Sequence, residues 1–336
     1  MIARLRGALD PFILALFAAV VLASLLPVRG TLAGAADGVT RAAIVLLFFL
    51  HGARLSREAI IAGAGNWRLH LSVLATTFML FPLLGLAIAA IPGLPPLIGA
   101  GMLFLALLPS TVQSSIAFTA IAGGNIAAAV CSASASNLIG VVLTPVLVAA
   151  LMSGAAGGGA GGGGGLSLGA IEDIVGQLLL PFLAGHLLRP LIGSFVARHK
   201  RLTTLVDRGS ILLVVYTAFS AAVVGGLWHQ LPLSSLALIV ALCAALLGLV
   251  LALTWAWGRL FAREDAIVLL FCGSKKSLAS GVPIARVLFP AAQVGAVILP
   301  LMVFHQIQLI ACAVIARALA GSAARQGAGT RAAARR

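Results

Sequence analysis

The residues best suited to chemistry interrupt two otherwise apolar segments. Residues 97–121 contain Pro-Ser-Thr-Val-Gln-Ser-Ser from Pro109, and residues 264–288 contain Gly-Ser-Lys-Lys-Ser from Gly273. Hydroxyl, amide and ammonium groups can hold an ion or a polar solute. A proline removes a backbone donor and disrupts the preceding helical turn. Freed backbone groups at such a break must be buried in protein or face a water-filled cavity.

These side chains and a few neighbours form the candidate binding site. An ammonium at the centre of a membrane helix costs about 3 kcal/mol on insertion scales, so a lysine pair there calls for a function. Adjacent residues point about 100° apart on a helix, so both lysines cannot face one narrow groove. One lysine is expected to line a solute path, and the other could pair with a carbonyl. The candidate binding residues are Gln113, Ser114, Ser115, Ser134, Asn137, Lys275, Lys276, Ser277 and Gln306, with Pro109 and Gly273 as helix-break residues.

Simpler structural interpretations exist for several polar residues. A proline kink with serines that bond nearby carbonyls would account for Pro109 taken alone. His305 could be a hydrogen-bonded core residue, and His51 is explained by a solvated boundary beside Arg54. Asn125, which follows two glycines, is expected to cap the next helix.

Composition identifies what kind of protein must position these residues. Of the 336 residues, 61% are hydrophobic and 9% are charged. A soluble domain usually has about a quarter of its residues charged. The chain is therefore expected to be an all-α polytopic membrane protein, in contact with the lipid bilayer over most of its surface. Its four cysteines lie in apolar runs without metal-ligand spacing, so neither a metal centre nor a disulfide framework is expected.

Ten apolar segments are long enough to be transmembrane helices, and the basic residues orient them. If both termini are cytoplasmic, 17 basic residues fall on the inner side and three fall on the outer side, namely Arg29, Arg41 and Arg286. Such an excess follows the positive-inside rule. The net charge of +14 is then a signal of topology rather than of nucleic-acid binding. We expect location in a bacterial inner membrane.

A glycine-rich stretch divides the chain into two halves of five segments. Residues 10–152 form the expected first repeat, 153–169 the linker, 170–318 the second repeat and 319–336 a basic cytoplasmic tail of one transporter unit. An odd number of spans per half inverts the second half, as in many transporters. The two interrupted segments are each the fourth span of a half, and such a pair is the best sequence pointer to a transporter site.

Several of these motifs resemble one known family, the bile acid:sodium symporter superfamily. The resemblance covers residues 10–318, and it is closest to the branch of bacterial sodium-dependent transporters and the vertebrate seventh member of solute carrier family ten. It is carried by the strings Leu108–Ser115, Gly124-Asn125, Leu143–Pro145, Phe48–Leu50, Cys272–Leu278 and His305–Gln308.

The resemblance implies a panel domain of spans 1, 2, 6 and 7 and a core domain of the other six, in which two broken helices cross. It places Ser114 and Ser115 on sodium-ligand positions. Other ligand positions differ, because Ala129 and Ala133 replace hydroxyl residues, Phe271 replaces a glutamate and Lys275 replaces a glutamine. These departures disfavour coordination of sodium by the family's usual ligands.

The expected function is secondary transport of a small organic anion, bile acid-like or another organic solute, by alternating access. Sodium or a proton is the expected coupling ion, and no other cofactor is expected. A regulatory membrane protein without transport and an intramembrane enzyme that pairs Ser114 or Ser115 with Lys275 are the alternatives. The sequence leaves open the identity of the solute, the direction of transport and the oligomeric state.

Overall fold

The computed structural model describes residues 11–54, 65–152, 172–173, 175–230 and 232–333, and these are helical with short connections. The expected linker 153–169 lies outside the described residues, as do residues 1–10 and the last three of the tail. The prediction of an all-helical membrane protein agrees with the described part. Eight helices there are long and apolar enough to cross a membrane, or nine if one strongly bent pair is counted as a span.

The helices of the first half fall on the apolar segments. They are α2 (Pro11–Leu25), α3 (Thr31–Arg54), α5 (Trp67–Ala75), α6 (Phe81–Ala89), α7 (Pro96–Leu107), α8 (Val112–Ile121) and α9 (Ile126–Met152). One π-helical turn, η1 (Thr76–Leu80), joins α5 to α6.

The helices of the second half also fall on apolar segments. After the π-helical turn η2 (Val175–Leu179), its helices are α11 (Leu180–Arg198), α12 (Lys200–Val224), the short α13 (Leu227–Gln230), α14 (Leu233–Gly258), α15 (Arg263–Gly273), α16 (Leu278–Leu288) and α17 (Ala291–Ala333). Helix α12 begins at Lys200, and α17 continues into the expected tail.

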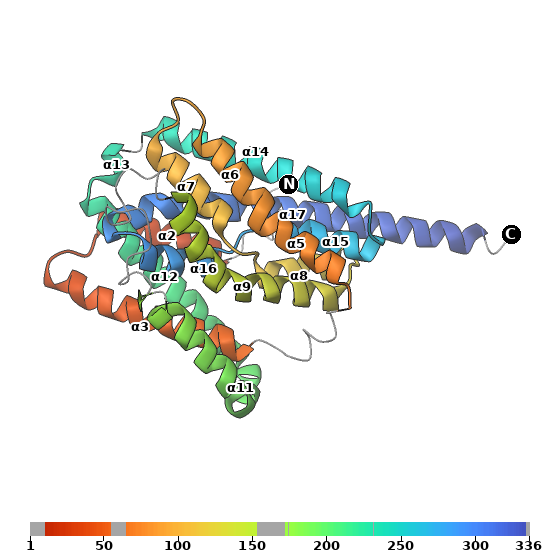
Figure 1. Cartoon of the computed structure of the whole chain (residues 1–336), viewed down its shortest axis with the longest axis horizontal. Coiled ribbons are helices and arrows are strands. Elements are labelled where there is room, and N and C mark those ends of the chain that lie inside the picture. Colours follow the sequence, from red (N-terminus) through yellow and green to blue (C-terminus); the bar gives the residue numbers. More distant parts are fainter. Residues whose placement is uncertain (1–10, 55–64, 153–171, 174, 231, 334–336) are drawn as a thin grey trace.

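Helices α15 and α16 occupy the centre of the bundle, whereas α3 and α11 lie at its periphery. In the most apolar stretch of each span, 94% of residues are buried for Arg263–Leu288 but only 22% for Thr31–Arg54 and 17% for Val175–Arg198. Figure 1 shows α3 and α11 packed together below the other helices. The segment with both buried lysines is therefore enclosed by protein rather than exposed to lipid, as expected for charged groups at membrane depth.

Small residues allow close contact between the peripheral helices. A Cβ at Gly185 of α11 would collide with the carbonyl oxygen of Phe49 on α3, and a Cβ at Gly52 of α3 would collide with that of Phe182 on α11. Glycine pairs of this kind bring two membrane helices together by van der Waals packing, because lipid provides no hydrophobic force between them.

Hydrogen bonds among two asparagines and one aspartate join the first turns of three helices. The Asn125 side chain accepts a hydrogen bond from the Ala128 amide at 3.0 Å, which confirms the predicted cap of α9. Asn66 caps α5 in the same way through the Leu69 amide. Both side-chain amides also donate to the Asp265 carboxylate, from Asn125 at 3.0 Å and from Asn66 at 2.6 Å. This carboxylate of α15 therefore links the capping residues of α5 and α9.

Candidate functional site

The predicted interruption at Pro109 is a sharp break between α7 and α8. Helix α7 ends at Leu107, α8 begins at Val112, and the two axes differ by 64°. Proline cannot donate a backbone hydrogen bond, and the carbonyls of the last turn before it lose their helical partners.

The carbonyls of residues 106–109 all accept hydrogen bonds from other segments of the chain. The ammonium of Lys276 donates to the oxygens of Ala106 at 2.8 Å and Leu108 at 2.7 Å. The Thr144 hydroxyl on α9 donates to the Leu107 oxygen at 2.9 Å. The backbone amide of Ser277 donates to the Pro109 oxygen at 2.9 Å. The break is therefore satisfied mainly by groups from the second interrupted segment.

The second break, between α15 and α16, is satisfied in return by side chains of the first. The Ser115 hydroxyl donates to the Phe271 oxygen at 3.0 Å, and Ser110 donates to the Cys272 oxygen at 2.6 Å. Thr111 donates to the Lys276 oxygen at 2.8 Å, and Gln308 of α17 bonds both the amide and the oxygen of Lys276. We call residues 106–111 and 271–277 together the crossing, because these two breaks complete each other's backbone bonding.

The two lysines of the crossing have different surroundings, and both are fully buried. Lys276 donates to three carbonyl oxygens, the third being Thr77 at 2.8 Å, so every N–H of its ammonium has an acceptor. Lys275 donates to the Ser114 hydroxyl at 3.2 Å, and its ammonium lies 4.2 Å from the centre of the Phe118 ring. Lys276 stabilises the break itself, whereas Lys275 faces a hydroxyl and an aromatic wall.

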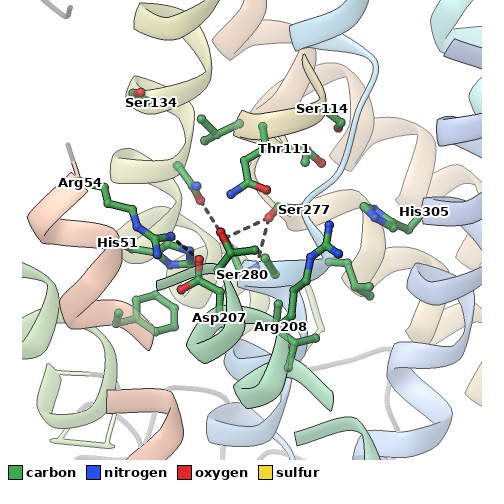
Figure 2. Close-up of a pocket in the computed structure, with 18 of the residues that line it drawn as sticks. His51, Arg54, Thr111, Ser114, Ser134, Asp207, Arg208, Ser277, Ser280 and His305 are labelled. Atoms are coloured by element: carbon green, nitrogen blue, oxygen red, sulfur yellow. Dashed lines mark hydrogen bonds and ion pairs between the residues drawn. The ribbon is translucent and has the colours of Figure 1, made fainter. Parts of the chain in front are cut away.

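A cavity of about 290 Å³ opens beside the crossing, and Figure 2 shows its polar wall. Ser280 at the start of α16 donates to the Asn137 side chain at 2.8 Å, and the Ser277 hydroxyl donates to the Ser280 hydroxyl at 3.1 Å. Aromatic and aliphatic side chains supply the remaining walls. They include Phe12, Phe48, Leu138, Val141, Phe182 and Ile211.

The cavity gathers some of the predicted binding residues and not others. Five candidates line it, namely Gln113, Ser114, Ser134, Asn137 and Ser277. Four candidates are not among its lining residues, namely Ser115, Lys275, Lys276 and Gln306. The side chains of Ser115 and Lys276 are turned to backbone carbonyls of the crossing, and the His305 side chain beside Gln306 does line the cavity.

The opposite wall holds charged and titratable residues, two of which, His51 and Arg54, were predicted to lie at a solvated membrane boundary. His51 and Arg54 come from the end of α3, and Asp207 and Arg208 come from the first turns of α12. Arg54 and Asp207 form an ion pair, and the Arg208 guanidinium lies 5.1 Å from the Phe12 ring centre. The sequence signal for this pair is an acid and a base near the ends of two different spans, but whether the two meet depends on how α3 and α12 pack.

The predicted sodium ligands are engaged within the protein. The Ser114 hydroxyl accepts from Lys275, and the Ser115 hydroxyl donates to the Phe271 oxygen. Phe271, Ala129 and Ala133 are buried and carry no side-chain oxygen. Among the described residues, no three histidine, cysteine or acidic side chains are grouped so that they could hold a metal ion.

Comparison with known proteins gives one consistent family. Residues 10–321 match the SBF-like CPA transporter family (DUF4137). The chain is 52% identical over 318 residues to "Putative symporter YfeH" of Escherichia coli, with 94% of both chains covered. It is 55% identical over 312 residues to "Uncharacterized protein PA2026" of Pseudomonas aeruginosa, with 92% of both chains covered.

More distant relatives belong to animals. The chain is 24% identical over 320 residues to "Sodium/bile acid cotransporter 7" of Danio rerio, with 92% of this chain and 93% of the relative covered. The names of the Escherichia coli and Danio rerio relatives describe a symporter and a cotransporter rather than enzymes, although Ser114 and Lys275 of this chain do lie within hydrogen-bonding distance.

Proposed function

Because the chain belongs to the SBF-like CPA transporter family, we propose that it is a secondary active transporter that moves a small organic anion across a bacterial inner membrane. The observation that carries the choice of an anion is the position of two helix N-termini at the cavity. Gln113 and Ser114 in the first turn of α8, and Leu278 and Ala279 in the first turn of α16, all line it. The partial positive charge of each N-terminus favours a negatively charged group there.

The proposed architecture has ten spans in two inverted repeats, with both termini in the cytoplasm. Helix α2 (Pro11–Leu25) is the tenth span in addition to the eight long helices and the bent pair. Helices α2, α3, α11 and α12 form the panel, and the remaining long helices form the core. The cavity has walls from both groups, as alternating access about a midplane site requires.

An ion pair supports the proposal that the cavity opens toward the cytoplasm. Asp37, near the start of α3, pairs with Arg286, near the end of α16. This pair joins panel to core at the end of the bundle that is opposite to Arg54 and Lys200. A conformation that opens toward the outside would require the two charges to separate, so the pair stabilises the inward-open arrangement.

Two coupling ions are compatible with the family. Sodium is supported by the printed names of the animal relatives. The Lys275 ammonium, which bonds the Ser114 hydroxyl, would repel a sodium ion at that hydroxyl, and this favours a proton or a sodium position away from Lys275.

The test is uptake into proteoliposomes of two radiolabelled anions, mandelate as a small one and taurocholate as a large one. Each is supplied with an inward sodium gradient, an inward proton gradient or no gradient. We expect accumulation above the external concentration for at least one anion under one of the gradients, and equilibration without a gradient. Equal uptake in all three conditions, or no uptake above protein-free liposomes, would contradict the proposal.

A further inference from the structure

The ion pair of Arg54 and Asp207 in the cavity wall is only half satisfied. The Arg54 Nη1 atom bonds the Asp207 Oδ2 atom, which leaves a second nitrogen and a second oxygen. Both of these atoms, Arg54 Nη2 and Asp207 Oδ1, are buried and make no hydrogen bond within the described part of the chain. Buried polar atoms without partners are rare in folded proteins, and each asks for an explanation.

The two unpaired atoms have complementary chemistry. A guanidinium nitrogen can only donate, and an ionised carboxylate oxygen can only accept. A ligand that satisfies both must present an acceptor to Arg54 and a donor to Asp207 at neighbouring positions. A carboxylate with a hydroxyl group on the adjacent carbon has this arrangement.

The charge around the pair selects an anion. Arg54 and Arg208 line the cavity together with His51, whereas Asp207 is the one acid among its lining residues. A second hollow of about 700 Å³ shares Arg54 with the cavity and adds Arg189 and Lys200. Basic residues that continue from one hollow into the other attract anions and raise their local concentration.

The rest of the cavity selects an apolar body. The rings of Phe12, Phe48 and Phe182 line it with aliphatic side chains, and its volume of about 290 Å³ suits a compact molecule. Figure 2 shows Arg54, Asp207 and His51 on one side of the cavity, with Ser277 and Ser280 close to its middle.

We propose that Arg54 and Asp207 bind the head group of the transported solute and that this solute is a 2-hydroxycarboxylate with a small apolar body. Arg54 donates hydrogen bonds to the carboxylate, and Asp207 accepts a hydrogen bond from the hydroxyl group. This inference rests on the proposed function, because it takes the cavity to be the solute site. It assigns head-group recognition to the panel helices α3 and α12 rather than to the two lysines of the crossing.

Three matched probes test the assignment by equilibrium binding to the purified full-length protein in detergent, measured by titration calorimetry. Mandelate carries both groups, phenylacetate lacks the hydroxyl and mandelamide lacks the charge. We expect the wild-type protein to bind mandelate several-fold more tightly than phenylacetate and to bind mandelamide weakest. Arg54→Gln is expected to weaken binding of both acids by about tenfold or more, since a charge-assisted hydrogen bond is lost.

The Asp207→Ala variant tests the hydroxyl contact through a ratio rather than an absolute affinity. It is expected to abolish the preference for mandelate over phenylacetate, which a merely structural effect would not do. Arg201→Gln makes the same charge change as Arg54→Gln at an exposed position of α12 and is expected to bind like the wild-type protein. Arg54→Lys, which keeps the charge, is expected to recover part of the affinity for both acids.

The inference is overturned if the wild-type protein shows no saturable binding of mandelate, if it binds acid and amide alike, or if Arg54→Gln binds as the wild type does. It is also overturned if a monodisperse Asp207→Ala variant keeps the preference for mandelate. Because binding is measured in micelles without a gradient, these outcomes are independent of uptake. Binding without uptake would contradict the proposed transport, and uptake without this selectivity would contradict the head-group assignment.

Discussion

The ammonium of Lys276 donates a 2.8 Å hydrogen bond to the carbonyl oxygen of Thr77, a residue 199 positions away in the sequence. Thr77 lies in the π-helical turn η1, where the Phe81 amide already bonds the Thr76 oxygen. With the same π-helical spacing, the donor to the Thr77 oxygen would be the backbone amide of residue 82, but this residue is proline and has no N–H. Lys276 thus replaces the backbone donor that is missing for Thr77 because residue 82 is proline. It also supplies donors to the two carbonyls, of Ala106 and Leu108, that lose their helical partners at the Pro109 break.

Lys276→Met is therefore expected to destabilise the protein far more than Lys275→Met. The first change leaves three buried carbonyls without a donor, and each such loss costs about 1–3 kcal/mol. The second change removes one bond to a hydroxyl that lines the cavity. The measurement is thermal unfolding in detergent together with the monodisperse fraction. Equal melting temperatures for the two variants would contradict the structural role of Lys276.

Lys275→Gln is expected to make the protein sensitive to sodium. The buried ammonium repels a cation at Ser114, and an amide would offer an oxygen ligand instead. We expect sodium chloride at roughly 100 mM, on the order of tenfold above the dissociation constant of a weak site, to raise the melting temperature of the variant more than that of the wild type. Choline chloride is the control salt. Equal sodium-specific stabilisation of both proteins would show that Lys275 does not oppose sodium binding.

The course of the chain could be predicted from its sequence, but the partners of its polar groups could not. The apolar runs and the break residues Pro109 and Gly273 locate the helices and both interruptions, because each reflects local physical chemistry. One hydrogen-bond acceptor of the Lys276 ammonium lies in a π-helical turn of a distant span, and no local pattern near the lysine indicates this. The pairing of Arg54 with Asp207 likewise requires the contact between α3 and α12, so from the sequence Arg54 is only one of the basic residues that orient the helices.

Asp37→Ala is expected to favour the conformation that opens to the outside. Its ion pair with Arg286 joins α3 of the proposed panel to α16 of the proposed core, and removing the carboxylate takes away that contact. The readout is labelling of Ser134→Cys, on the cavity wall, by a membrane-impermeant maleimide in right-side-out vesicles, because the four native cysteines are buried. We expect labelling to increase several-fold.

The matched control for this experiment is Arg41→Gln. Arg41 also pairs with Asp37, but it lies on the same helix and its side chain is 60% exposed. An exposed pair of this kind contributes little, so labelling of Ser134→Cys should stay at the level of the starting protein. An equal increase with Arg41→Gln and Asp37→Ala would point to a general loosening of α3 instead of a panel-to-core contact.

Gly185→Ala is expected to lower stability by about 1–3 kcal/mol, because overpacking forces α3 and α11 apart. The added methyl would collide with the Phe49 carbonyl. Gly176→Ala is the control, since no heavy atom outside its own helix lies within 4 Å of a Cβ added there. Thermal unfolding in detergent compares the two. A Gly185→Ala variant as stable as the control would mean that the two helices are free to separate.

The reciprocal bonding at the crossing determines how the specificity of the proposed solute site can change over evolutionary time. The carbonyls of residues 106–109 and those of Phe271, Cys272 and Lys276 all accept hydrogen bonds from other segments of the chain. A solute in the cavity therefore meets side chains and helix N-termini rather than these carbonyls. Selectivity can then be altered by exchanging single wall residues while the backbone scaffold stays intact, so one architecture can be adapted to many solutes.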